Sequence, residues 1–128
     1  MSDARAVSVA YIEAVGQKQF ERVATLLHPD VEFKMPGRAV IGAEAYVASL
    51  QRLAPILLRN DVKKTVVEGQ DVCVIYDFVT DTAVGVVPSV EWLRVEDGRI
   101  RSIQLVFHSQ PWPAVVEELT RRAGVSPA

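Results

Sequence analysis

Alternating apolar and polar positions between Val86 and His108 predict two strands joined by a tight turn. The turn is Asp97-Gly98, because a type I′ hairpin needs positive φ at both central residues and this dipeptide tolerates it. On the returning strand Ile103, Leu105 and Phe107 share the face that is predicted to point inward. The pattern therefore indicates a β-hairpin with one apolar face and one mostly polar face.

The outgoing strand of this hairpin places a carboxylate on the apolar face. The same alternation groups Glu91 with Leu93 and Val95, and it places Trp92 and Arg94 on the opposite face. A carboxylate among apolar side chains requires a hydrogen-bond partner, a proton or a function. Glu91 is therefore a candidate site residue, although a shift of one residue in register would turn it to solvent.

Helical spacing of apolar residues predicts three helices in the N-terminal half of the chain and one near the C-terminus. The predicted helices run from Ser2 or Asp3 to Val15, Lys18 to Leu27, Gly42 to Pro55 and Pro113 to Arg122. Gly16 is predicted to break the first helix, and His28-Pro29-Asp30 to stop the second. The other predicted strands are Val31–Met35, Arg38–Ile41, Leu57–Val67 and Val72–Thr80. This order favours one α+β domain over residues 1–128, with helices on one face of a curved, mostly antiparallel sheet.

Composition narrows the classes of function. The net charge is −2 and the basic residues are scattered, which argues against nucleic-acid binding. The chain contains no apolar run long enough to cross a membrane, and no signal peptide is evident. Cys73 has no partner cysteine, which favours a reducing, cytoplasmic setting. His28 and His108 form no metal motif, so we expect neither a metal nor a cofactor.

Two blocks of the sequence resemble a known family. The first runs from Tyr11 through Phe20 to the Pro-Asp-Val-Glu-Phe-Lys-Met-Pro segment that ends at Pro36, and the second from Pro88 to Phe107. In this order and spacing they resemble the ketosteroid isomerase branch of the NTF2-like (SnoaL-like) superfamily. The resemblance implies a cone-shaped α+β barrel that encloses a pocket, and it covers nearly the whole chain.

The resemblance also implies roles for three positions. Tyr11 falls on the tyrosine that donates a hydrogen bond to the substrate oxyanion, and Glu91 on an acid that its apolar surroundings keep protonated. Met35 falls on the aspartate that acts as general base, and methionine cannot accept a proton. The inward positions of the last strand are Ile103, Leu105 and Phe107, which departs from the acidic residue of the hydrolase and cyclase branches. From its sequence alone, Tyr11 is equally consistent with a core tyrosine.

These positions lead to a pocket and to two hypotheses about its use. The pocket lining is predicted to be Tyr11, Phe33, Met35, Tyr46, Leu50, Glu91, Leu93, Leu105 and Phe107. It suits a small hydrophobic ligand with one carbonyl or hydroxyl group. The protein is then either an isomerase-like or cyclase-like enzyme with Tyr11 and neutral Glu91 as oxyanion donors, or a non-catalytic ligand-binding or interaction protein.

Two tryptophans indicate covered surfaces. Trp92, on the outer face of its strand, favours a homodimer. Trp112 follows the last strand between two prolines, where it either closes the mouth of the cone or lies at a subunit contact.

Overall fold

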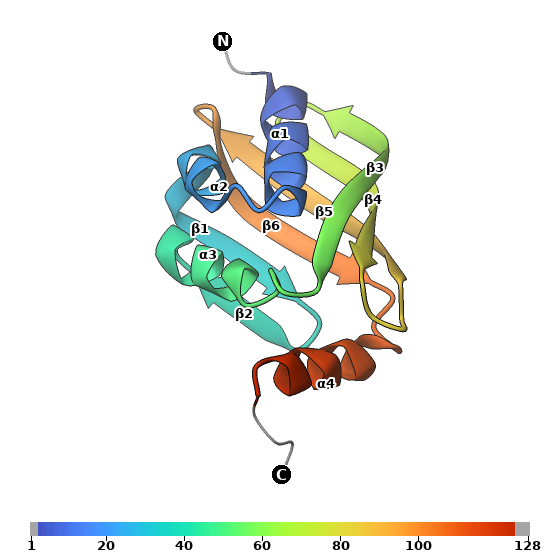
Figure 1. Ribbon diagram of the computed structural model, residues 1–128. Coiled ribbons are helices and arrows are strands. Elements are labelled where there is room, and N and C mark those ends of the chain that lie inside the picture. Colours follow the sequence, from blue (N-terminus) through green and yellow to red (C-terminus); the bar gives the residue numbers. More distant parts are fainter. Residues whose placement is uncertain (1–2, 125–128) are drawn as a thin grey trace.

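The computed structural model describes residues 3–124, which form four helices and a six-stranded curved sheet (Figure 1). The helices are α1 (Ala4–Gly16), α2 (Phe20–Leu26), α3 (Ala43–Gln51) and α4 (Trp112–Arg122). The strands are β1 (Leu27–Met35), β2 (Arg38–Ile41), β3 (Leu57–Glu68), β4 (Asp71–Thr80), β5 (Val86–Glu96) and β6 (Arg99–Phe107). The α+β class is therefore confirmed.

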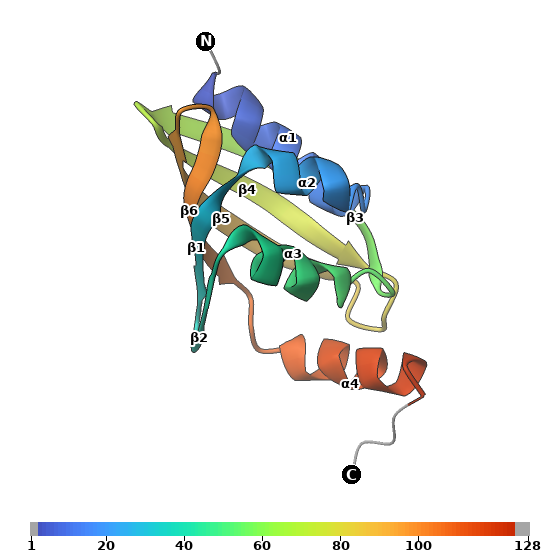
Figure 2. The same cartoon turned by 90° about the vertical axis from the view of Figure 1, so that its left-hand side faces the viewer.

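The sheet has the order β2-β1-β6-β5-β4-β3, and β1 and β6 are its one parallel pair among the described residues. Its edges, β2 and β3, do not meet, so the cone is an open curved sheet. Helices α1, α2 and α3 lie on one side of it, and α4 lies across one end (Figure 2). Between residues 3 and 124 no helix combines the length and the hydropathy needed to cross a membrane.

The β5–β6 hairpin has the predicted register. Asp97 and Gly98 have φ values of 51° and 76°, as a type I′ turn requires. Burial along β5 alternates, with Glu91 and Leu93 buried and Trp92 exposed. The hairpin thus turns Glu91 toward the helices, and the alternative in which it faces solvent is excluded.

The connection from α1 to α2 differs from its prediction. The Asp3 side chain caps α1 by accepting a hydrogen bond from the Arg5 amide at 2.9 Å, whereas Ser2 lies outside the described residues. Gly16 is still helical, and the left-handed residue is Lys18 with a φ of 60°. Gly16 is required for another reason, because a Cβ there would lie 2.5 Å from the backbone nitrogen of Asn60 on β3. The glycine permits close packing of α1 on the sheet.

Three other boundaries also differ. The second helix ends at Leu26, and β1 begins at Leu27, so the proline expected to stop a helix lies inside a strand. Leu27 already pairs with Ile100 of β6, and this pairing brings the chain into the sheet early. Helix α3 ends at Gln51, before Pro55. The mixed polarity of β3 follows from two register shifts against β4.

Candidate functional site

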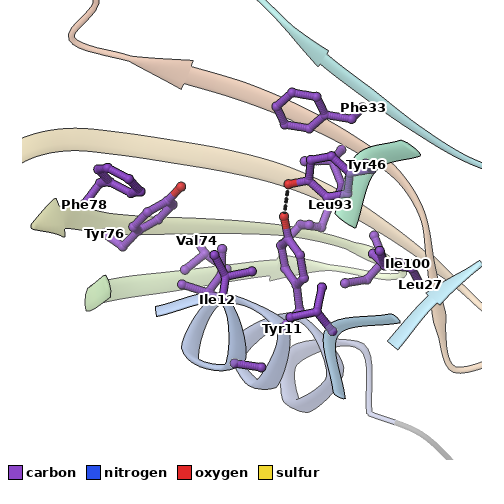
Figure 3. Packing of buried hydrophobic residues seen from close by; sticks show 14 of the residues in the cluster. Tyr11, Ile12, Leu27, Phe33, Tyr46, Val74, Tyr76, Phe78, Leu93 and Ile100 are labelled. Atoms are coloured by element: carbon purple, nitrogen blue, oxygen red, sulfur yellow. Dashed lines mark hydrogen bonds between the residues drawn. The ribbon is translucent and has the colours of Figure 1, made fainter. Parts of the chain in front are cut away.

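Four buried polar side chains from four elements form one hydrogen-bonded cluster. The hydroxyl of Tyr11 (α1) donates to Oε1 of Glu91 (β5) at 3.0 Å, and the hydroxyl of Tyr76 (β4) donates to Oε2 at 2.5 Å. The hydroxyl of Tyr46 (α3) is hydrogen-bonded to that of Tyr11 (Figure 3). Each of the four residues is at most 5% exposed. We call Tyr11, Tyr46, Tyr76 and Glu91 the tyrosine–glutamate cluster.

The proton of each hydroxyl in this cluster can be assigned by counting. A tyrosine hydroxyl has one proton, and Tyr11 gives its proton to Glu91. Tyr46 must therefore be the donor in its bond with Tyr11. An ionised Glu91 accepts two tyrosine hydrogen bonds in this arrangement. A protonated Glu91 has one further proton, which is available to an acceptor in front of the cluster.

The cluster is assembled by the sheet register and by the helices that cover it. Val74 on β4 lies directly opposite Glu91, so Tyr76 is the diagonal neighbour of Glu91 on the same face. Long side chains reach across such a diagonal. Tyr46 also stacks on Phe33 of β1, with ring centroids 4.5 Å apart. These contacts hold the donors in fixed positions around the carboxyl group.

Burial shifts the pKa values in the cluster. Loss of solvation raises the pKa of Glu91 to about 7, and the hydrogen bonds from Tyr76 and Tyr11 oppose part of this increase. Burial also raises the pKa values of Tyr11, Tyr46 and Tyr76 well above 10, and the nearby Glu91 carboxylate raises them further. The tyrosines therefore remain protonated donors at neutral pH, while Glu91, with a pKa of about 7, is present there in both its protonated and its ionised form.

A cavity of about 310 Å³ opens in front of the cluster. Its wall is mostly apolar, and it contains all four members of the cluster. The remaining lining residues are Val15, Phe33, Met35, Arg38, Ser49, Leu50, Arg52, Leu53, Asn60, Phe78, Val87, Ser89, Leu105, Phe107, Trp112 and Val116. This volume is at the low end for ligand pockets, which suits a small ligand.

Most of the residues predicted for the pocket do line this cavity. Eight of them, namely Tyr11, Phe33, Met35, Tyr46, Leu50, Glu91, Leu105 and Phe107, belong to its wall. Leu93 does not, because it lies two residues nearer the hairpin turn and is fully buried in the core. Glu91 is the one carboxylate in the wall as the described residues form it, so no acid takes the place of Met35.

Tyr76 is the member of the cluster that sequence reasoning missed. The alternation Val74, Tyr76, Phe78 marks the inner face of β4, so a tyrosine on the cavity side was predictable. Its bond to Glu91 depends on the pairing of β4 with β5, which local patterns do not reveal. The two arginines in the wall were missed as well, because nothing in their local sequence distinguishes them.

Trp112 lies at the mouth of the cavity. Its ring packs edge-on against Phe107, with centroids 5.3 Å apart, and against Phe78 at 6.0 Å. The far end of α4 is held by Arg122, which forms an ion pair with Asp81 at 2.6 Å. Trp112 is thus part of the cavity wall, and its place at a subunit contact stays a prediction.

Solved structures with this fold come from several bacteria. A protein from Kribbella flavida superposes with a TM-score of 0.80 at 23% identity, and the match covers 94% of this chain and 96% of that one. An NTF2-like protein of unknown function from Cytophaga hutchinsonii gives 0.76 at 23%, covering 88% and 96%. A steroid delta-isomerase from Pseudomonas aeruginosa gives 0.74 at 19%, covering 94% and 91%. At these identities the matches show a shared fold.

At the level of sequence, residues 9–103 match the model of the SnoaL-like domain family. The comparison with curated proteins gave no match. The matched segment contains the whole tyrosine–glutamate cluster and ends before α4.

Proposed function

The chain belongs to the SnoaL-like domain family, and we propose that its cavity binds a small, mostly apolar molecule through one carbonyl or hydroxyl oxygen. The observation that carries this proposal is the buried carboxyl of Glu91, which faces the cavity and is hydrogen-bonded to Tyr11 and Tyr76. A buried polar cluster at the end of an apolar cavity provides one point of polar recognition.

In this proposal, two hydrogen-bond donors hold the carbonyl or hydroxyl oxygen of the ligand. Neutral Glu91 donates its own proton to the ligand, and Tyr11 turns its hydroxyl from Glu91 to the same oxygen. Tyr46 continues to donate to Tyr11, which strengthens the bond that Tyr11 gives. Donors arranged in this way stabilise negative charge on an enolate oxygen, which is the requirement of an isomerase-like or cyclase-like reaction.

Naphthalene and 2-naphthol test the binding step, because they differ by one hydroxyl. We expect fluorescence titration to show tighter binding of 2-naphthol by the wild type. Tyr11→Phe should reduce this preference by about two- to tenfold, the range of one neutral hydrogen bond. Equal affinity for the two compounds in the wild type would contradict recognition of an oxygen by the cluster.

The presence of Met35 favours binding without efficient turnover, because proton abstraction needs a base. Glu91 does not serve as donor and base at once, and no other carboxylate lines the cavity among residues 3–124. The second candidate function is therefore that of a non-catalytic binding protein with the same pocket.

Met35→Asp distinguishes these two functions. An aspartate at this position would remove a proton from C2 of cyclohex-3-enone, and the dienolate would be protonated at C4 to give cyclohex-2-enone. We expect a measurable increase in ultraviolet absorbance with the Met35→Asp variant and none with Met35→Asn, which has the same shape but no basic carboxylate. A folded Met35→Asp variant without activity would count against oxyanion stabilisation and in favour of binding alone.

A further inference from the structure

Two arginines line the same cavity as the tyrosine–glutamate cluster. Arg38 is the first residue of β2, and Arg52 follows the last residue of α3, so they enter the wall from different elements. Both are exposed, whereas the cluster is buried. They therefore lie toward the solvent side of the cavity, and the cluster lies at its inner end.

The charges of these arginines are not balanced within the described chain. Neither guanidinium forms an ion pair or a side-chain hydrogen bond with any residue from 3 to 124, whereas Arg59, Arg94 and Arg122 each pair with a carboxylate. The one carboxylate in the cavity wall, Glu91, is already bonded to Tyr11 and Tyr76. The cavity thus has two positive groups toward its mouth.

The other polar groups of the wall are mostly satisfied by the protein. The hydroxyl of Ser49 donates to the carbonyl of Tyr46 at 2.7 Å, and that of Ser89 donates to the carbonyl of Val87 at 3.0 Å. The side-chain amide of Asn60 donates to the carbonyl of Ile12 at 3.0 Å, and its Oδ1, which is an acceptor, has no partner among the described residues. The strong donors left for a ligand are therefore the cluster at one end and the two guanidinium groups at the other.

We propose that the natural ligand is an amphipathic acid, with a carbonyl or hydroxyl oxygen against the tyrosine–glutamate cluster, an apolar body across the cavity and a carboxylate or similar anion beside Arg38 and Arg52. This inference rests on the proposed function, because it assigns the second end of a molecule whose first end binds the cluster. Guanidinium groups suit the anion because their planar donors match both oxygens of a carboxylate. The two positive charges also disfavour a cationic ligand.

A matched pair of probes separates this inference from the proposed function. The probes are 2-naphthol and 6-hydroxy-2-naphthoic acid, which share the ring and the hydroxyl and differ in the carboxylate. At pH 6 we expect the acid to bind the wild type about fivefold more tightly or better, and this preference should shrink in high salt. In the Arg38→Gln/Arg52→Gln variant the ratio of the two dissociation constants should fall to about one.

The control variant is Arg5→Gln/Arg99→Gln, which removes the same charge from exposed positions outside the cavity wall. It should keep the wild-type ratio. If both probes bind the wild type equally, the inference is overturned and the proposed function stands. If the control loses the preference as fully as the cavity variant, the effect is one of net charge and the inference is again overturned. If neither probe binds, both the inference and the proposed function fail.

Discussion

Glu91 is the one carboxylic acid in the cavity wall that residues 3–124 form. Its side chain is 5% exposed, so ionisation would place a charge in a low-dielectric environment. Hydrogen bonds from Tyr11 and Tyr76 compensate part of that cost, which places the pKa at about 7. A carboxyl group with this pKa exists in both protonation states at neutral pH. It can therefore donate to a ligand oxygen in one state and accept a proton in the other.

The raised pKa of Glu91 makes the stability of the protein depend on pH. Between about pH 4.5 and pH 7 the folded state holds a proton that the unfolded state has lost, so stability falls as the pH rises through this window. We expect the wild type to lose on the order of 3 kcal/mol relative to Glu91→Gln between these limits. Urea unfolding of both proteins at several pH values measures the difference. Parallel stability curves would show that Glu91 is not shifted.

At the scale of elements, the sequence pattern predicted the features that depend on contacts between residues close together in the chain. The β5–β6 hairpin followed from alternation and from Asp97-Gly98, and the structure has both the turn and the burial pattern. Periodicity also placed Tyr11 on the apolar face of its helix and Glu91 on the inner face of its strand, while the assignment of Tyr11 to the pocket came from the family resemblance. Tyr11 and Glu91 then meet at 3.0 Å.

Local patterns failed where a distant contact decides the geometry. The requirement for glycine at position 16 comes from its approach to Asn60, and the early start of β1 accompanies the pairing of Leu27 with Ile100. The bond from Tyr76 to Glu91 depends on the register between two strands. Each of these contacts joins residues that are separated in the chain. The sequence around one partner therefore does not predict which residue it will contact.

At the scale of the whole molecule, the outer face of the sheet remains apolar in the isolated chain. Ile75, Val90 and Val106 form one row across β4, β5 and β6, and Trp92 lies in the next row beside Cys73. Val106 is 57% exposed and Trp92 51%. Contiguous exposed apolar rows are typical of interaction surfaces. The homodimer stays a prediction, and this face is where we expect its interface.

We expect sedimentation analysis to show a dimer of the wild type and a folded monomer of Ile75→Arg/Val106→Arg, because two charges would have to be buried in the interface. Circular dichroism checks that the variant keeps its fold. A wild type that is monomeric at concentrations of tens of micromolar would contradict a stable dimer.

Titration of the Glu91 carboxyl carbon by ¹³C NMR tests the site most directly. The assignment comes from the signal that disappears in Glu91→Gln. We expect a midpoint near pH 7, because the carboxyl is buried and held by two tyrosines. A midpoint near 4.3, the value of a solvated glutamate, would show that Glu91 is hydrated and that the cluster does not hold a neutral acid for a ligand oxygen.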